Sequence, residues 1–433
     1  MFNKLMNMFS VGEFSRNIFV LLTGSILSQA IPIAVSPIIT RLYSPKEFGV
    51  FALYVSIFSI ISVVATARYE LAIMLPDNEE DAVNLFGLSI VIASIISLIS
   101  LVIVMLFHSK IVGLLNEPDI SSLLYFIPLS ILCTGVYQAL TYWANRRKQY
   151  KRMTASKINQ SGLTALCNLL FGSTGVKFSG LIGSLIIGQL LATGIFARQL
   201  WKEDHPYKNL LNKEQMIKNA KKYKDFPKIN SFHAFLDMIK ENGVVFIIAS
   251  IFGSTILGYY SFTMRMLKLP AGLISSSVSQ VIYQKSTEIY NSNGDLQIFI
   301  RKTMILLALF GTPVFLIIIL FAPMLFEWTF GESWREAGVY AQLISPWMLA
   351  NFVVSPTSHI PIILNRQKTA FYLSVTFNLF VLVIFFIISK VVQHIYIGLA
   401  IMGGMGFLYT LVYGFWIVNL AKNKKMGKSV ESI

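Results

Sequence analysis

Residues 83–107 read VNLFGLSIVIASIISLISLVIVMLF and carry no charged side chain. An α-helix rises about 1.5 Å per residue, so a stretch of this length crosses a hydrocarbon core of roughly 30 Å. In that water-free core every backbone N–H and C=O group needs a partner, and a helix supplies those partners by itself. The stretch therefore predicts a transmembrane helix.

The same pattern recurs along the chain, with short polar breaks between the apolar segments. Hydrophobic residues make up 55% of the sequence and charged residues only 13%, against about 25% charged residues in soluble domains. The alternating strands of a transmembrane barrel are not found in the sequence. We predict an all-α, polytopic membrane protein with twelve transmembrane helices, at residues 17–40, 48–67, 83–107, 121–143, 155–174, 178–200, 230–252, 256–282, 303–326, 338–363, 369–391 and 395–419.

The basic residues of this chain are distributed unevenly between its loops. When each residue at the end of a span is counted with its adjoining loop, the inner loops and tails hold 27 of the 36 Lys and Arg residues and the outer loops hold 6. Positive charge favours the cytoplasmic side, so both termini are expected there. The net charge of +15 thus reflects topology and anionic membrane lipids as partners, and no nucleic acid partner is expected.

The longest break between spans, residues 201–229, is rich in lysine and divides the chain into two sets of six spans. We predict an N-terminal six-helix lobe at 1–200, a basic cytoplasmic linker at 201–229, a C-terminal six-helix lobe at 230–420 and a basic tail at 421–433. Six is an even number, so both lobes have the same orientation across the membrane. Parallel repeats of this kind predict a pseudo-two-fold axis and a central cavity between the lobes.

Several kinds of chemistry have no matching motif in the sequence. There is no Gly-x-x-x-x-Gly-Lys-Ser/Thr loop for ATP, and the glycines at 403, 404 and 406 lie within an apolar span, where close helix packing explains them. The five histidines lack metal-ligand spacing, and no outer loop is long enough for a catalytic domain. We therefore expect no cofactor, no metal and no enzymatic activity.

Charged residues deep in a span are costly, so they are candidates for function. One helical face of span 230–252 carries His233, Asp237, Lys240 and Glu241. Span 256–282 carries Arg265 and Lys268 on a polar face of its own. The two spans enter the membrane from opposite sides, so their depths predict that Arg265 lies level with Glu241 and Lys268 level with Asp237.

These side chains predict a wet interior with paired charges. Arg265, Lys268 and Lys240 outnumber the two carboxylates by one positive charge, which suits an anionic substrate. We assign substrate binding to these three cations and ion pairing or ion coupling to Asp237 and Glu241. A purely structural set of ion pairs is the alternative interpretation. Weaker candidates are Arg41 and Arg68 at the ends of their spans, His233, and Asn351 and His359 in a proline-rich span.

Three segments of this chain resemble Wzx-type oligosaccharide flippases. The matching segments are Ala67-Arg68-Tyr69-Glu70-Leu71-Ala72-Ile73-Met74-Leu75-Pro76 with the acidic run after it, Lys222-Tyr223-Lys224-Asp225-Phe226-Pro227, and Phe330-Gly331-Glu332-Ser333-Trp334-Arg335-Glu336-Ala337-Gly338 with Pro346-Trp347 and Ser355-Pro356. They are spread over most of the chain. The resemblance implies the twelve-helix, two-lobed fold of the multidrug/oligosaccharidyl-lipid/polysaccharide exporter superfamily and a substrate of undecaprenyl diphosphate that carries a short oligosaccharide.

A fourth segment, Arg265-Met266-Leu267-Lys268-Leu269-Pro270-Ala271-Gly272, is similar to the Arg-Leu-x-x-Leu-Pro-x-Gly pattern of the lipid II flippases. In that family the arginine lies in a central cationic cavity, which implies the same place for Arg265, whereas Lys268 stands at a variable position. The lipid II flippases have further cavity arginines in their first two spans, where this chain has only Arg41 and Arg68 near helix ends. The departure implies a different lipid-linked substrate.

The sequence thus predicts a flippase of lipid-linked oligosaccharide repeat units in the bacterial inner membrane, acting in the synthesis of O-antigen or a capsule-like polysaccharide. Its partners would be that substrate, membrane lipids and other polysaccharide assembly proteins. A multidrug or small-solute antiporter on the same fold is the main alternative, and a cavity with net negative charge would favour it. A membrane polymerase or ligase would need a larger outer loop, and a scaffold without transport would have no use for buried charges.

Overall fold

The computed structural model describes residues 13–175, 178–203 and 205–422, and within those residues the chain is helical, with no β-strand. Each of the twelve predicted spans overlaps a helix. Nine segments of the described chain are long and apolar enough to cross a membrane, and the other three, α7, α10 and α11, carry more polar side chains. The protein is therefore a multi-pass membrane protein, and the number twelve stays a prediction.

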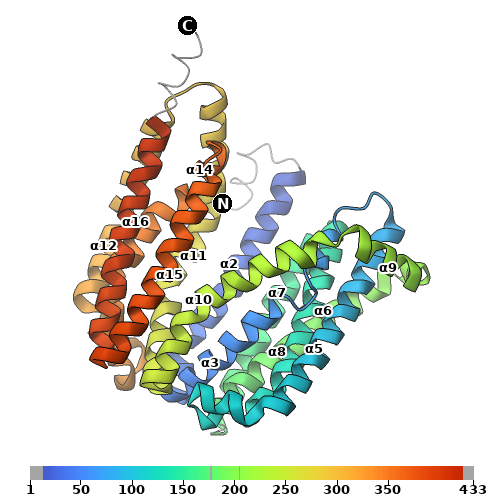
Figure 1. Ribbon diagram of the computed structural model, residues 1–433, viewed down its shortest axis with the longest axis horizontal. Helices are drawn as coiled ribbons and strands as arrows, with labels where there is room; N and C mark the ends of the chain where they lie inside the picture. Colours follow the sequence, from blue (N-terminus) through green and yellow to red (C-terminus); the bar gives the residue numbers. More distant parts are fainter. Residues whose placement is uncertain (1–12, 176–177, 204, 423–433) are drawn as a thin grey trace, which may run out of the picture. The chain divides into compact units, whose positions relative to one another are not determined.

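The chain divides into two compact units, residues 1–254 and 255–433. The first contains α2 (Glu13–Leu42), α3 (Pro45–Ser62), α4 (Tyr69–Ala72), α5 (Glu79–Leu115), α6 (Ile127–Arg146), α7 (Tyr150–Ser173), α8 (Phe178–Glu203), α9 (Lys213–Lys222) and α10 (Ser231–Phe252) (Figure 1). The predicted linker, 201–229, thus lies inside this unit together with α10, because α10 packs against α3.

Local sequence signals explain where the helices of the first unit begin. Ser44 and Glu47 form a reciprocal capping box at the start of α3, where Pro45 takes the first helical position. Asn78 caps α5 by accepting a hydrogen bond from the Asp81 N–H group. Three acidic residues in the first turn interact favourably with the positive end of the helix dipole. The Asn78 cap thus fixes the point at which the segment that joins α3 to α5 enters α5.

Apolar packing of α5, α6 and α8 builds the core of the first unit. Trp143 of α6 is buried there with Leu85 of α5 and with Phe196 and Leu200 of α8. Tyr69, the first residue of α4, and Ile73, which follows that helix, belong to the same cluster. The short segment between α3 and α5 is therefore anchored to the core of its unit.

The second unit consists of α11 (Ser254–Asn291, whose first residue belongs to the first unit), α12 (Leu296–Phe330), α13 (Arg335–Val354), α14 (Ile360–Ile363), α15 (Gln367–Val392) and α16 (Ile395–Lys422). Glycines let its helices approach closely. A Cβ atom on Gly338 of α13 would lie 2.5 Å from the Pro323 Cα of α12, and one on Gly403 of α16 would lie 2.6 Å from the Leu343 carbonyl oxygen. The packing role expected for the glycines of the last span is thus confirmed at Gly403.

Prolines interrupt the helix that was predicted at 338–363. α13 runs through Pro346 and ends at Val354, immediately before a 3₁₀ turn at Ser355–Thr357, and α14 then resumes at Ile360. Pro356 lies in that turn, where its missing N–H group costs no helical hydrogen bond. The predicted cytoplasmic tail, 421–433, lies outside the described residues except for its first two.

Candidate functional site

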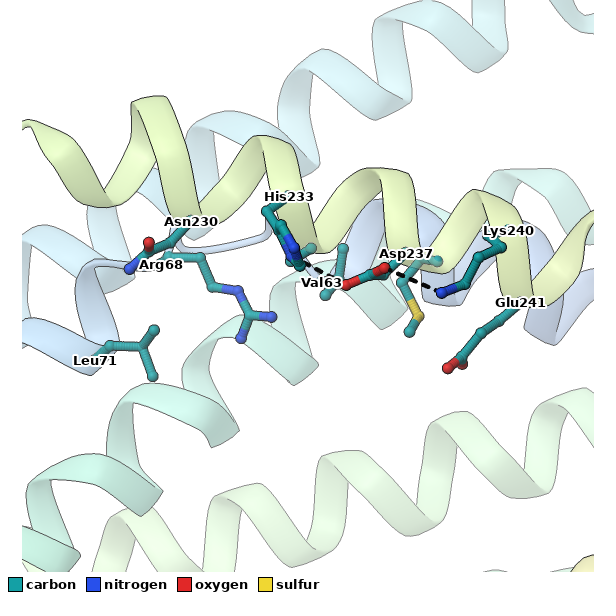
Figure 2. Close-up of a pocket in the computed structure, with 10 residues that line it drawn as sticks. Val63, Arg68, Leu71, Asn230, His233, Asp237, Lys240 and Glu241 are labelled. Carbon is teal, nitrogen blue, oxygen red and sulfur yellow. Dashed lines mark hydrogen bonds and ion pairs between the residues drawn. The ribbon is translucent and has the colours of Figure 1, made fainter. Parts of the chain in front are cut away.

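A pocket of about 450 Å³ lies within the first unit, between α10 and the segment that follows α3 (Figure 2). Its lining combines one face of α10 with residues from the turn after α3 and from α4. The lining residues are Val63, Arg68, Leu71, Asn230, His233, Ala234, Asp237, Met238, Lys240 and Glu241. The four charged or titratable residues of α10 share one face, as their spacing predicts.

Asp237 is the centre of the polar contacts on α10. Its Oδ2 atom lies 3.0 Å from His233 Nδ1, one turn earlier, and its Oδ1 atom lies 3.4 Å from Lys240 Nζ (Figure 2). Asp237 is partly exposed to the pocket, so each contact contributes modestly to stability. Glu241 forms no ion pair within the described part of the first unit, and its exposed carboxylate faces the same pocket.

Arg68 reaches this pocket from an unusual backbone position. Helix α3 ends at Ser62, residues 63–68 form turns, and both Ala67 and Arg68 adopt left-handed backbone angles, with φ of 49° and 62°. For residues other than glycine such angles cost roughly 1 kcal/mol each and are retained where surrounding contacts hold them. The turn directs the Arg68 side chain toward α10 (Figure 2).

The buried carboxylate of Glu70 holds this turn in place. Glu70 is 1% exposed, and its Oε2 atom accepts a hydrogen bond from the Thr66 hydroxyl group. Arg68 Nη1 lies 3.7 Å from Glu70 Oε1, while Arg68 Nε is buried without a hydrogen-bond partner among the described residues. Burial raises the pKa of the Glu70 carboxyl group, and the Thr66 hydrogen bond and the Arg68 charge oppose that rise.

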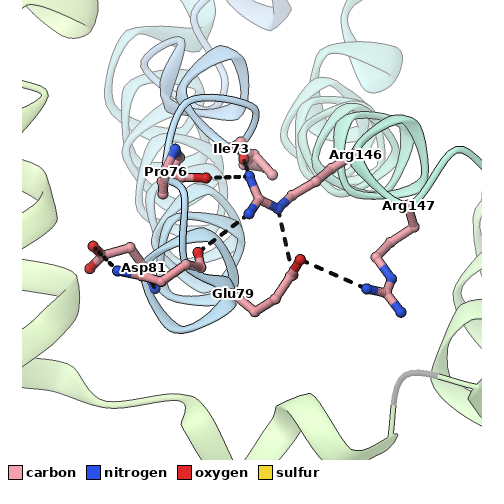
Figure 3. Close-up of polar contacts among 7 residues, drawn as sticks. Ile73, Pro76, Glu79, Asp81, Arg146 and Arg147 are labelled. Atoms are coloured by element: carbon pink, nitrogen blue, oxygen red, sulfur yellow. Dashed lines mark hydrogen bonds and ion pairs between the residues drawn. The ribbon is translucent and has the colours of Figure 1, made fainter.

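The segment after α4 is clamped by Arg146 at the end of α6 (Figure 3). Its guanidinium group donates to the carbonyl oxygens of Ile73 (3.2 Å) and Pro76 (2.8 Å), and its Nε atom lies 3.5 Å from Glu79 Oε2. Arg147 lies 3.8 Å from the other carboxylate oxygen of Glu79. These contacts fix the chain between the Arg68 turn and α5. The sequence offers little sign of this role, because Arg146 stands in an ordinary basic loop.

Arg265 and Lys268 are exposed residues on one side of α11 in the second unit. The opposite side of that helix packs on α12 and α13. Phe262 contacts Trp334 and Phe330, with ring centroids 4.5 and 4.9 Å apart, and Thr263 donates a hydrogen bond to the Ala337 carbonyl oxygen at 2.7 Å. The two cations are therefore directed away from the core of their unit. The predicted pairs Arg265–Glu241 and Lys268–Asp237 join different units and stay predictions.

The weaker candidates outside the pocket have local contacts. Arg41, in the last turn of α2, donates to the Pro37 carbonyl oxygen at 2.7 Å. Asn351 is exposed on α13. His359 packs edge-on against Tyr283, with ring centroids 5.2 Å apart. None of these contacts joins them to the pocket of the first unit, so Arg68 and His233 are the weaker candidates that the structure brings together with the α10 residues.

Comparison with protein families gives a match over most of the chain. A family model described as "Polysaccharide biosynthesis protein" matches residues 38–339, a range that includes Arg68, the charged face of α10, Arg265 and Lys268. A comparison with curated proteins finds no match.

Solved transporter structures have the same fold. The chain is similar to the inward-facing conformation of a multidrug resistance MATE family transporter of the MOP superfamily (13% identity, TM-score 0.69, covering 92% of this chain and 96% of that chain). It is also similar to the lipid II flippase MurJ in an inward closed conformation (14% identity, TM-score 0.67, covering 94% and 91%). A MATE transporter of Vibrio cholerae gives a TM-score of 0.54 at 14% identity, covering 95% and 96%.

Proposed function

Because the chain belongs to the polysaccharide biosynthesis protein family, we propose that it is a flippase that moves undecaprenyl-diphosphate-linked oligosaccharide repeat units across the bacterial inner membrane. The repeat units would be used for O-antigen or a capsule-like surface polysaccharide. The chain acts as a transporter and catalyses no reaction in this proposal. Its membership of the family and its transporter fold support the coarser function of an exporter.

The charged pocket beside α10 is the observation that carries the proposal. Charged groups within a membrane-spanning helix cost free energy, so they are candidates for function. This pocket gathers a guanidinium, an ammonium and two carboxylates. The substrate's diphosphate is an anion, which a planar guanidinium group can bind through two parallel hydrogen bonds. We assign this contact to Arg68, with Lys240 as a second cation.

The side chains of this pocket carry no net positive charge of their own, so further cations are needed to attract an anion. Within the first unit Arg68 and Lys240 balance Asp237 and Glu241, and Asp237 is already paired with Lys240. We propose, as the sequence suggests, that Arg265 and Lys268 also bind the diphosphate. The polyprenyl tail would stay in the lipid.

A gene deletion tests the proposed function directly. A strain that lacks this protein should accumulate lipid-linked repeat units accessible only from the cytoplasmic side, and the chain should restore surface glycan when it is expressed again. The control is a strain that lacks the glycosyltransferase that starts the repeat unit, in which nothing accumulates. Normal surface glycan in the deletion strain, together with new sensitivity to cationic drugs, would instead support a small-solute antiporter.

A further inference from the structure

Helix α9 is attached to the first turns of α5 by side-chain hydrogen bonds. Gln215 Nε2 donates to Asp81 Oδ1 at 2.5 Å, and Asn219 Nδ2 donates to the Asp81 carbonyl oxygen at 3.2 Å. Just before α9, the Asn212 N–H group donates to Asn84 Oδ1 at 2.7 Å. These bonds fix which face of α9 is turned toward the protein.

The same contacts place α9 at the level where the apolar stretch of α5 begins. Leu211 and Met216 pack on Gly87, since a Cβ atom there would lie 2.8 Å from Leu211 Cδ2 and 2.5 Å from Met216 Cε. Gly87 belongs to the uncharged run that extends to residue 107. A helix that touches the first residues of a membrane-spanning run lies at the boundary between headgroups and hydrocarbon.

The outer face of α9 is basic with an apolar centre. Lys213, Ile217 and Lys221 follow each other at four-residue spacing, and Lys218 lies beside them. All four are exposed, and Ile217 is 48% exposed although it is a large apolar residue. Glu214 is the one acidic residue on this face of the helix, so the face keeps a positive excess. A basic face around an apolar side chain is typical of helices that lie in a membrane interface.

We propose that the outer face of α9 binds anionic phospholipid headgroups of the cytoplasmic leaflet, with Ile217 inserted at the boundary between headgroups and acyl chains. Three lysines meet the negative surface potential of that leaflet, and the predicted topology places α9 on that side. The Tyr69 hydroxyl group donates to the Ala220 carbonyl oxygen at 2.9 Å. Headgroup binding would therefore restrain the segment next to Arg68 as well as α9.

A fluorescent label at position 217 tests the proposal in the full-length protein. With Cys133 and Cys167 replaced by alanine, Ile217→Cys is labelled with an environment-sensitive dye, and the protein is placed in nanodiscs of phosphatidylcholine with or without phosphatidylglycerol. Nitroxides attached to lipid headgroups report contact by quenching. We expect more quenching and a blue shift of emission when phosphatidylglycerol is present. High salt should abolish the additional quenching and blue shift that phosphatidylglycerol causes.

Matched charge variants identify the residues responsible. The triple variant Lys213→Gln, Lys218→Gln, Lys221→Gln should lose the phosphatidylglycerol-dependent quenching. The control removes the same charge from exposed lysines outside α9, in the triple variant Lys151→Gln, Lys302→Gln, Lys368→Gln. This control should retain the phosphatidylglycerol-dependent quenching. Equal quenching in both lipids would mean apolar insertion alone, and no quenching in either would mean that this face meets water or another protein. Either result overturns the proposal, and the salt dependence tests it without any lysine variant.

Discussion

The Arg68 guanidinium lies 3.7 Å from the Glu70 carboxylate, measured between Nη1 and Oε1, and the two groups have different surroundings. The Glu70 side chain is 1% exposed, whereas that of Arg68 is 26% exposed and lines the pocket beside α10. The buried carboxylate thus depends on a cation that is also available to a ligand. A substrate anion at Arg68 would compete with Glu70 for the same guanidinium group.

The first prediction concerns Arg68. Arg68→Ala should strongly reduce glycan export, and it should destabilise the protein by up to about 3 kcal/mol because the Glu70 carboxylate loses its nearest charge partner. Arg68→Lys keeps the charge and should retain part of the export. Surface glycan and protein abundance are measured together, and the double variant Arg68→Ala, Glu70→Gln separates the two effects. If that variant exports normally, Arg68 has only a structural role.

The second prediction concerns the pH dependence of stability. Burial raises the pKa of the Glu70 carboxyl group in the folded protein above its unfolded value of about 4.3. The folded state then holds its proton more tightly, so the contribution of Glu70 to stability is present below the unfolded pKa and is lost as pH rises through the folded pKa. Glu70→Gln should flatten this part of the pH profile in thermal unfolding of purified protein. An unchanged profile would contradict the assignment.

The spacing of charged residues on α10 predicted which side chains lie together better than any single residue did. His233, Asp237 and Lys240 lie at offsets that place them on one helical face, and the structure brings all three into one pocket with contacts of 3.0 and 3.4 Å at Asp237. Helical periodicity is a local property, so one sequence suffices to read it. The twelve apolar runs likewise predicted helices, but not their ends: α5 and α12 extend beyond their runs, whereas α3 ends at Ser62, before the end of its run.

The position of the Arg68 side chain could not be read from the sequence. Its position depends on two consecutive left-handed residues, Ala67 and Arg68, neither of which is glycine. Such angles are disfavoured for these residue types and are imposed by tertiary contacts, here the burial of Glu70 and the packing of Tyr69. The sequence therefore indicated Arg68 only as a weaker candidate at the end of its span, whereas the structure places its side chain in the pocket beside α10.

The third prediction concerns topology. The charge distribution predicts that α9 lies on the cytoplasmic side, so Lys221→Cys should resist an impermeant thiol reagent in intact spheroplasts and react after lysis. Lys110→Cys, at the exposed end of α5, should react in intact spheroplasts. Native Cys133 and Cys167 are replaced beforehand. Labelling of position 221 from outside would refute the predicted orientation.

The fourth prediction concerns coupling to an ion gradient. Asp237 lies in ion-pair contact with His233 and Lys240. Glu241 lines the same pocket, so either carboxylate could bind a proton or a sodium ion during transport. Asp237→Asn with Glu241→Gln should make export insensitive to collapse of the gradient that drives it. The measurement is transport in vesicles with each gradient dissipated in turn. Transport that responds as in the wild type would leave both carboxylates with a structural role.

The last prediction concerns Arg265, an exposed residue of α11. If Arg265 binds the diphosphate, Arg265→Ala should abolish surface glycan while the protein still accumulates. Arg265→Lys keeps the charge but loses the planar fork. The loss of one charge-assisted hydrogen bond, about 1.5–3 kcal/mol, corresponds to roughly 10- to 100-fold weaker binding, so export should be impaired but measurable. Lys285→Ala is the matched control, since Lys285 lies on the same helix and pairs with Glu288 at 2.8 Å.

A double variant distinguishes substrate binding from a structural ion pair. The depths of their spans pair Arg265 with Glu241 in the sequence-based prediction, so Arg265→Ala alone would leave that carboxylate without its partner and could lower protein abundance. Adding Glu241→Gln removes the unpaired charge. If the arginine serves only to neutralise Glu241, the double variant regains export, because no charge is left uncompensated. If the arginine binds the diphosphate, export stays lost at normal abundance, because removing a carboxylate does not replace the guanidinium group that the substrate needs.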